Sequence, residues 1–226
     1  MATVIFFTDY SINSVSIPRV DTVNDLGISV NKNLNFSEYI SASVSKAYSR
    51  SFRIFKGFCS RNPQLLIKAY ITYVRPLLEY NTYIWSPCDI GNITKIENVQ
   101  RRFTKRINVL ADLSYKDRLI ALNLESLELR RLKFDLVMMY KIVHNLVDLD
   151  CDSFVNVTST ITRNANLKIF KPRAVCTIRA NFICVRSINA WNFLSETTRA
   201  ASSIAIFKRL LSKCNLDDFL TVFKFS

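Results

Sequence analysis

Glycine and proline are scarce in this chain, which contains 3 glycines and 5 prolines in 226 residues. Glycine and proline are the residues that most often end helices and form tight turns, so their scarcity favours long helices over a turn-rich β architecture. Because 49% of the residues are hydrophobic and 12% are aromatic, the chain has the composition of a folded domain and not of a disordered basic tail. The sequence therefore predicts a mainly α protein.

The first 36 residues are the exception to the helical pattern. Three short β-branched or aromatic runs, separated by Asp, Asn and Ser turn residues, predict strands over 4–7, 14–20 and 26–30. Three strands of this length make a weak sheet by themselves. We expect residues 1–36 to be a β segment whose sheet is completed by something upstream.

Residues 37–147 predict a helical domain. Ser37 is a candidate N-cap, Asn62-Pro63 reads as a cap followed by proline in the first turn, Pro76 must kink or end the second helix, and Ser114 with Asp117 resembles a capping box. The predicted apolar stripes are Ile40, Val44, Ala47, Ser51, Ile54 and Phe58 on the first helix; Leu66, Ala69, Tyr70 and Tyr73 on the second; Ile93, Ile96, Phe103, Ile107 and Leu110 on a helix opening at Asp89; and Leu129, Leu132, Leu136, Met139 and Val143 on a helix over 125–146.

The remaining sequence predicts a polar linker over 148–165 and a small C-terminal helical region over 166–226. The C-terminal region begins with a possible strand at 167–170 and continues with helices near 182–194 and 203–213.

The formal charge of +13 favours a polyanionic partner. Between residues 37 and 110 there are twelve Lys and Arg against four Asp and Glu. At 100° per residue these cations project away from the apolar stripes of two predicted helices. The candidate nucleic-acid-binding residues are Lys46, Arg50, Arg53 and Lys56 on the first helix and Lys95, Arg101, Arg102, Lys105 and Arg106 on the third.

Rows of cations on rigid helices suit successive phosphates of a duplex, to which Thr104 could add a hydroxyl contact. The alternatives are an ordinary solvated polar face and, less favoured, a membrane surface. Tyr80, Tyr83 and Trp85 could stack on bases, but burial at the helix junction is the favoured interpretation.

Other chemistry is not indicated. The six cysteines form no CxxC pair and His144 is the single histidine, which argues against zinc and for reduced thiols. Asp217-Asp218 reads as a helix start, and no nucleophile elbow or phosphate-binding glycine loop is present. The apolar run near the N-terminus is too short for a signal peptide and no stretch is long enough for a membrane span, so we expect an intracellular protein of the nucleus or cytoplasm.

Several short motifs occur in a recognisable order. They are Arg75-Pro76-Leu77-Leu78-Glu79-Tyr80, Trp85-Ser86-Pro87, Val99-Gln100-Arg101-Arg102-Phe103-Thr104-Lys105, Asp117-Arg118-Leu119 and Leu127-Glu128-Leu129-Arg130-Arg131. In this order and spacing the chain resembles the region downstream of the palm in the reverse transcriptases of non-LTR (LINE-type, Jockey/CR1-like) retrotransposons. The resemblance departs from the family pattern in the tail, at Asn164, Ala165 and Ser195.

The resemblance implies the thumb and C-terminal region of an RNA-directed DNA polymerase, with RNA–DNA hybrid or duplex nucleic acid as the partner. The catalytic carboxylates and their Mg²⁺ belong to a palm that precedes this region in the family, so we expect a noncatalytic fragment without a cofactor of its own. We also expect an upstream polymerase or endonuclease portion as a partner, and we expect no membrane partner. The open alternatives are a helical protein-interaction module, an inert relic, and an active polymerase whose palm is encoded upstream.

Overall fold

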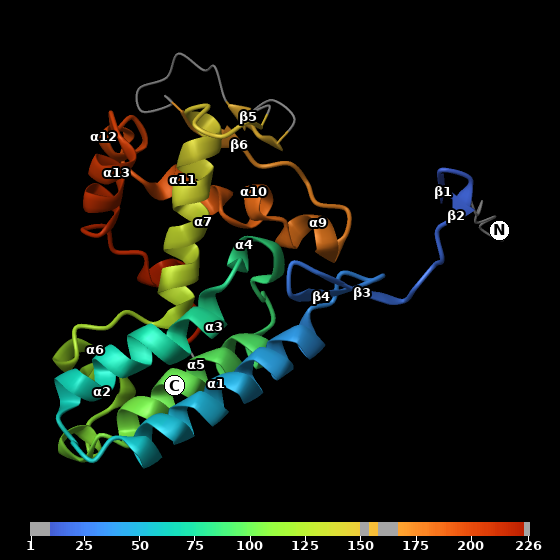
Figure 1. Ribbon diagram of the computed structural model, residues 1–226. Helices are drawn as coiled ribbons and strands as arrows, with labels where there is room; N and C mark the ends of the chain where they lie inside the picture. The colour runs from blue at the N-terminus through green and yellow to red at the C-terminus, as the bar shows by residue number, and fades with distance from the viewer. Residues whose placement is uncertain (1–9, 150–153, 158–166, 224–226) are drawn as a thin grey trace. The chain divides into compact units, whose positions relative to one another are not determined.

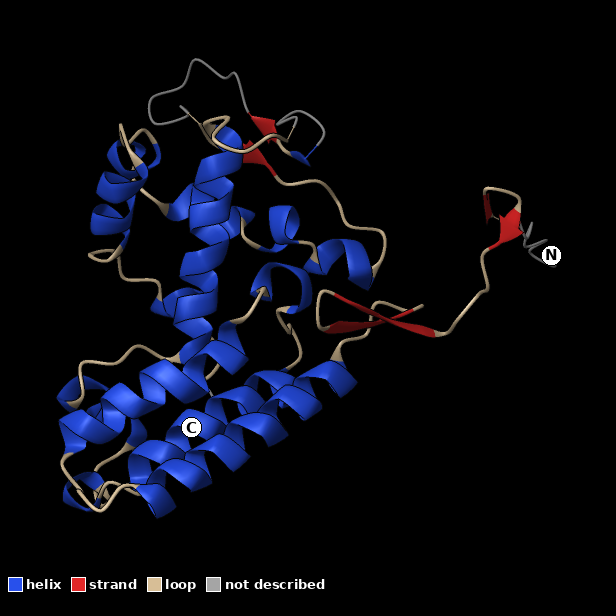
Figure 2. Cartoon of the chain, in the orientation of Figure 1, coloured by secondary structure: helices blue, strands red, loops and turns tan. Residues whose placement is uncertain are grey.

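The computed structural model describes residues 10–149, 154–157 and 167–223. Figure 2 shows that helices dominate this part of the chain and that the strands are short. The expected mainly α fold is confirmed. Residues 1–39 and 40–226 form two compact units, which are described separately.

The first unit contains two antiparallel hairpins. Strands β1 (Ser11–Ile12) and β2 (Val15–Ser16) form one, and β3 (Thr22–Asp25) and β4 (Ile28–Asn31) form the other, with Val23 opposite Val30. Leu26 and Gly27 connect β3 to β4 with positive φ angles of 47° and 82°. Such two-residue turns match the twist of a hairpin.

The strand prediction was only partly right. The predicted strand at 4–7 lies outside the described residues. Only Val15 and Ser16 of the stretch 14–20 are in a strand, and the strand Thr22–Asp25 was missed. Asn24 and Asp25 signal a turn in the sequence, whereas the turn lies two residues later, at Leu26-Gly27.

The second unit begins within α1 (Ser37–Gly57), which is followed by α2 (Pro63–Ala69), a π-helical turn η1 (Tyr70–Val74), α3 (Arg75–Glu79) and α4 (Thr82–Trp85). The side chain of Asn62 accepts hydrogen bonds from the amides of Gln64 and Leu65, as the Asn-Pro pattern predicts. Pro76 has no amide hydrogen to donate. The wide turn at 70–74 precedes it, so the chain stays helical through α3 instead of ending.

Helix α5 (Ile90–Lys105) starts at Asp89, whose side chain accepts a hydrogen bond from the Asn92 amide at 2.7 Å. It ends earlier than its apolar stripe suggested. Ile107 and Leu110, the last residues of that stripe, are buried but lie beyond the helix: Ile107 precedes the 3₁₀ turn η2 (Asn108–Leu110), and Leu110 ends it. Helix α6 (Tyr115–Ala121) starts at Ser114, which caps the amide of Asp117.

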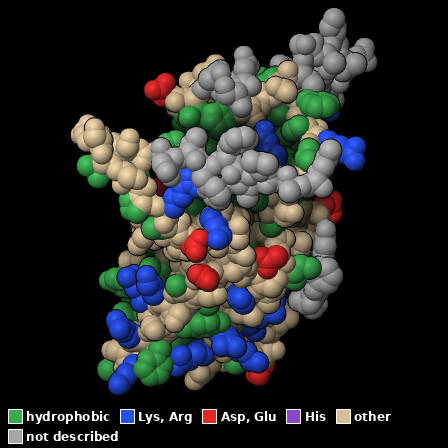
Figure 3. Space-filling view, turned by 90° about the vertical axis from the view of Figure 1, so that its right-hand side faces the viewer, with side chains coloured by type: hydrophobic (Ala, Val, Ile, Leu, Met, Phe, Trp, Pro, Cys, Tyr) green, Lys and Arg blue, Asp and Glu red, His purple; other side chains and the backbone are tan. Residues whose placement is uncertain are grey.

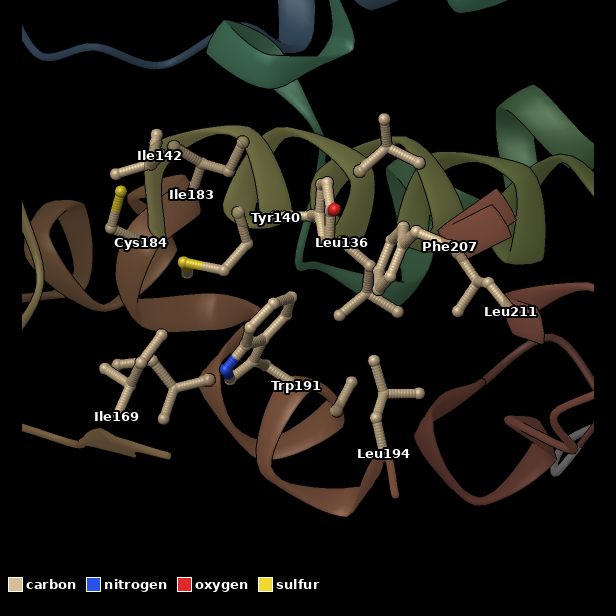
Figure 4. Packing of buried hydrophobic residues seen from close by; sticks show 14 of the residues in the cluster. Leu136, Tyr140, Ile142, Ile169, Ile183, Cys184, Trp191, Leu194, Phe207 and Leu211 are labelled. Atoms are coloured by element: carbon tan, nitrogen blue, oxygen red, sulfur yellow. The ribbon is translucent and has the colours of Figure 1, made fainter. Parts of the chain in front are cut away.

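Helix α7 (Leu127–Val143) is followed by β5 (Asn156–Val157), β6 (Ile169–Phe170), α9 (Thr177–Asn181), α10 (Ile183–Arg186), α11 (Ile188–Phe193), α12 (Glu196–Arg199), α13 (Ile204–Leu211) and η3 (Asp217–Phe219). The main core forms where α7 packs against β6, α10, α11 and α13. Figure 1 shows α7 beside α11 and α13, and Figure 4 shows Trp191 and Phe207 in the core against α7. Val155, within the predicted linker, belongs to this same core.

The apolar stripes were predicted with some errors of phase. On α1 the buried aromatic is Phe55, and Phe58 is only half-buried. Tyr73 is 54% exposed instead of lining the core. On α7 the predicted Leu129, Leu132 and Val143 are partly buried at the edge of the cluster. Helix α7 has neighbours on more than one side, so a single-stripe pattern underestimates its burial.

Candidate nucleic-acid interface

Four cations line the solvent side of α1. Lys46, Arg50, Arg53 and Lys56 are all exposed, while Ile40, Val44, Ala47 and Ile54 are buried on the opposite side. At 1.5 Å per residue, Lys46 and Lys56 stand roughly 15 Å apart along the helix axis. The only carboxylate of the helix, Glu38, lies in its first turn, so the row carries one sign of charge.

Helix α5 presents a second row. Lys95, Arg102 and Lys105 are exposed, as is the C-cap residue Arg106. The helix contains one carboxylate, Glu97, which is 1% exposed and therefore contributes nothing to the surface. The exposed charge of α5 is thus entirely positive.

Aromatic side chains join the two rows. The guanidinium of Arg102 lies 5.3 Å from the ring centroid of Tyr48, and that of Arg106 lies 4.2 Å from the ring of Phe55. Beneath them Phe55 packs on Phe103 with ring centroids 4.8 Å apart. Two cations of α5 therefore rest on α1. We call the nine exposed or half-buried cations of the two helices the α1–α5 surface: Lys46, Arg50, Arg53, Lys56, Lys95, Arg101, Arg102, Lys105 and Arg106.

Figure 3 shows Lys and Arg side chains gathered over the lower part of the molecule, with few Asp or Glu among them. That part contains α1 and α5 in Figure 1. The imbalance counted in the sequence is therefore also an imbalance in space.

Ion pairing separates the structural cations of this protein from those of the α1–α5 surface. Arg130 pairs with Glu79, Lys133 pairs with Glu125, and Arg186 pairs with Asp135 at 2.8 Å. Within residues 10–149, 154–157 and 167–223, none of the nine cations of the α1–α5 surface forms a salt bridge. Their charge is not neutralised by the described part of the fold.

The nine cations are not equivalent. Arg101 is half-buried, its guanidinium lies 4.9 Å from the ring centroid of Tyr115, and its buried Nε has no hydrogen-bond partner among the described residues. Arg50 donates a hydrogen bond from Nη1 to the carbonyl of Tyr73 at 3.0 Å. Lys46, Arg53, Lys56 and Lys105 are exposed and have no such structural contact in the described chain, so they are the most available to a ligand.

Thr104 does not face solvent, contrary to our expectation. Its side chain is fully buried, and its hydroxyl donates to the carbonyl of Gln100 at 3.0 Å. The same hydroxyl accepts a hydrogen bond from Nε of Arg118 at 3.2 Å. Thr104 therefore holds α6 against α5 and cannot contact a phosphate.

A buried polar network holds α5 in place. The carboxylate of Glu97 accepts hydrogen bonds from the Tyr115 hydroxyl at 2.5 Å and from the amides of Leu127 and Glu128 at 3.2 Å. It thereby caps the N-terminus of α7, where the helix dipole favours a negative charge. Burial nevertheless raises the pKa of Glu97 above 4.5, against the opposing effects of the Tyr115 hydroxyl and of Arg131.

Gln100 continues this network from the next turn of α5. Its amide oxygen accepts from the Tyr70 hydroxyl, and its amide nitrogen donates to the Tyr115 hydroxyl and to the carbonyl of Glu125. Burial strongly raises the pKa of the Tyr70 and Tyr115 hydroxyls, so both stay protonated and able to donate. The network fixes α5 to η1, α6 and α7, and the surface cations are mounted on a rigid helix.

Sequence reasoning missed these buried polar residues. A signal was present, because Glu97, Gln100 and Thr104 recur at the same three-and-four spacing as Ile93, Ile96 and Phe103. Polar residues in phase with an apolar stripe indicate a buried network rather than a solvated face.

The aromatic residues after Pro76 divide in two. Trp85 is 2% exposed and its indole Nε1 donates to the carbonyl of Tyr80 at 2.7 Å, whereas the side chain of Tyr80 is 51% exposed. Trp85 is therefore part of the core and unavailable for stacking. Burial was the favoured expectation for all three aromatic residues, and it is wrong for Tyr80.

Other candidate centres are accounted for by local structure. His144 is the C-cap residue of α7, and its Nε2 lies 2.8 Å from the carbonyl oxygen of Arg199. Asp217 and Asp218 occupy the first turn of η3. In the described part of the chain no three His, Cys, Asp or Glu side chains are grouped so that they could hold a metal ion, and no helix there is long and apolar enough to cross a membrane.

The fold and this surface define a mainly helical protein with a cationic face built on two helices. The chain is 31% identical, over 129 residues, to an uncharacterized protein of Caenorhabditis elegans. The alignment covers 55% of this chain and 63% of the nematode protein, so the chain spans less than two thirds of that relative. No family model and no solved structure matches the chain.

Proposed function

We propose that the α1–α5 surface binds template–primer nucleic acid, either an RNA–DNA hybrid or a duplex. In this proposal the chain is a noncatalytic C-terminal part of a LINE-type reverse transcriptase, the family that its motifs resemble, and it acts with a polymerase portion that supplies the chemistry. The role is that of a thumb, which holds the duplex without reacting with it.

One observation carries the proposal. Nine cations lie on two helices that touch through Tyr48 and Phe55, and none forms a salt bridge within the described residues. An unneutralised charge row of one sign costs self-repulsion unless it gains a counter-charge. A phosphodiester backbone supplies that charge at regular spacing, with counterion release as the driving force.

The family motifs agree with a scaffold role for most of their residues. Glu79 and Arg130 pair with each other, Gln100 is buried in the network, and Arg118 is 4% exposed. The motifs therefore support a shared fold, while the cations that would contact nucleic acid lie mostly outside them.

Fluorescence anisotropy of labelled RNA–DNA hybrid, duplex DNA and single strands across a salt series tests the proposal. The test variant changes four exposed cations that make no structural contact within the described residues: Lys46→Gln, Arg53→Gln, Lys56→Gln and Lys105→Gln. The control variant removes four exposed charges from other elements: Lys171→Gln, Lys208→Gln, Arg209→Gln and Lys213→Gln.

We expect the test variant to bind more weakly and with a less steep salt dependence, by about 1 in slope for each phosphate that the variant no longer binds. The control variant should bind as the wild type does. Weak binding that is the same for all three proteins would contradict the proposal, and it would leave a helical protein-interaction module or an inert relic.

A further inference from the structure

Phe52 is an exposed aromatic residue in the middle of the α1–α5 surface. Its side chain is 56% exposed, and it is the only large hydrophobic residue of α1 that faces solvent to this degree. Every other large apolar side chain in the central turns of α1, from Val44 to Phe55, is at least half-buried. The other apolar side chains of these turns close the core, and the Phe52 ring is left at the surface.

The ring lies between the two rows of cations. Phe52 follows Tyr48 and precedes Lys56 by one turn each, so the three side chains share one flank of α1. Arg102 of α5 lies over the Tyr48 ring at 5.3 Å, which places that flank toward α5. On the opposite flank Arg50 bonds to the carbonyl of Tyr73, which places that side toward η1.

An aromatic face set among cations suits a nucleobase. The cations can follow the sugar–phosphate backbone while the ring stacks on a base, and such stacking tolerates any base because each has a π face. Bases inside a duplex already stack on each other, so the ring needs an unpaired base.

We infer that Phe52 stacks on an unpaired base next to a bound duplex, so that the ligand of the α1–α5 surface is a junction of single strand and duplex. This inference rests on the proposed function, and it adds the form of the nucleic acid. A membrane is a less suitable ligand of this surface, because the apolar side of α1 is buried and a single exposed ring offers little area for insertion.

The probes are a blunt labelled hairpin duplex and the same hairpin with a single-stranded overhang of about four nucleotides, the smallest common site size. The variants are Phe52→Ala, Phe52→Trp and the control Phe170→Ala, which removes an aromatic side chain of nearly equal exposure (58%) from β6. Circular dichroism and thermal unfolding check that each variant is folded.

We expect Phe52→Ala to weaken binding of the overhang probe by about 5- to 150-fold, the range of one stacked base, and to leave the blunt hairpin unchanged. Phe52→Trp should retain affinity. Its new indole should be quenched by the overhang probe against the signal of Trp85 and Trp191, which are 2% and 0% exposed.

Equal losses for both probes, no loss for Phe52→Ala, or an equal loss for Phe170→Ala would each overturn the stacking role. If the lysine and arginine variants still weaken binding in that case, the proposed function stands without it. Binding of wild type to anionic vesicles but to neither hairpin would refute both the inference and the proposed function.

Discussion

Replacing Glu97 by alanine tests whether the buried network supports the helices of the α1–α5 surface. Glu97 is 1% exposed and accepts three hydrogen bonds, from the Tyr115 hydroxyl and from the amides of Leu127 and Glu128. It also stabilises the charged form of Arg131, which is 3% exposed and whose terminal nitrogens have no hydrogen-bond partner among the described residues.

The expected cost follows from what alanine leaves behind. Alanine would leave the Tyr115 hydroxyl and the amides of Leu127 and Glu128 without their acceptor, and an unsatisfied buried donor costs about 1–3 kcal/mol. Three such costs at one site do not simply add. We therefore expect Glu97→Ala to lower the free energy of unfolding by about 3–5 kcal/mol, a large share of the roughly 5–15 kcal/mol typical of domains.

Urea unfolding followed by circular dichroism measures this free energy. The control is Asp112→Ala, which removes an exposed carboxylate and should change stability by less than about 0.5 kcal/mol. A loss below about 1 kcal/mol for Glu97→Ala would refute the reasoning, since it would mean that Arg131 and the α7 amides do not depend on this carboxylate.

Two further predictions concern buried carboxylates. Because burial raises the pKa of Glu97 above its unfolded value of 4.5, the folded state binds the proton more tightly. The contribution of Glu97 to stability should then be largest below about pH 4.5 and should decline as pH rises through the raised pKa. Urea titrations at several pH values should therefore show the wild type losing stability relative to Glu97→Gln over that window. A constant difference between the two proteins would contradict this. Asp135→Ala should destabilise the fold by about 3 kcal/mol in thermal or urea unfolding, because Arg186 would lose its counter-charge. Arg186 binds Asp135 at 2.8 Å and also donates to the carbonyls of α4. A change within about 0.5 kcal/mol, as for an ordinary surface site, would argue against this.

Local signals in the sequence predicted the starts of helices well. Asn62, Asp89 and Ser114 each cap the helix that the pattern assigned to them, because capping depends on residues within one turn. The exposed sides of α1 and α5 were also predicted, since a periodic apolar stripe fixes the opposite face whatever it packs against.

Contacts between distant segments were not predictable in this way. Arg131 and Asp135 lie outside the apolar stripe predicted for α7, yet both are at most 3% exposed because α7 has neighbours on more than one side. The pairing of Asp135 with Arg186 joins residues 51 apart, which no local pattern encodes. The approach of α5 to α1 that places Arg102 on Tyr48 is of the same kind.

The most direct test of the proposed role is the salt dependence of duplex binding. The measurement is the slope of log affinity against log salt for the wild type and for the variant with Lys46, Arg53, Lys56 and Lys105 changed to glutamine. If all four contact phosphates of B-form DNA, the slope should become less steep by up to about 3.6, at about 0.9 per phosphate. An unchanged slope, with the control variant indistinguishable from both, would contradict the claim that this surface binds nucleic acid.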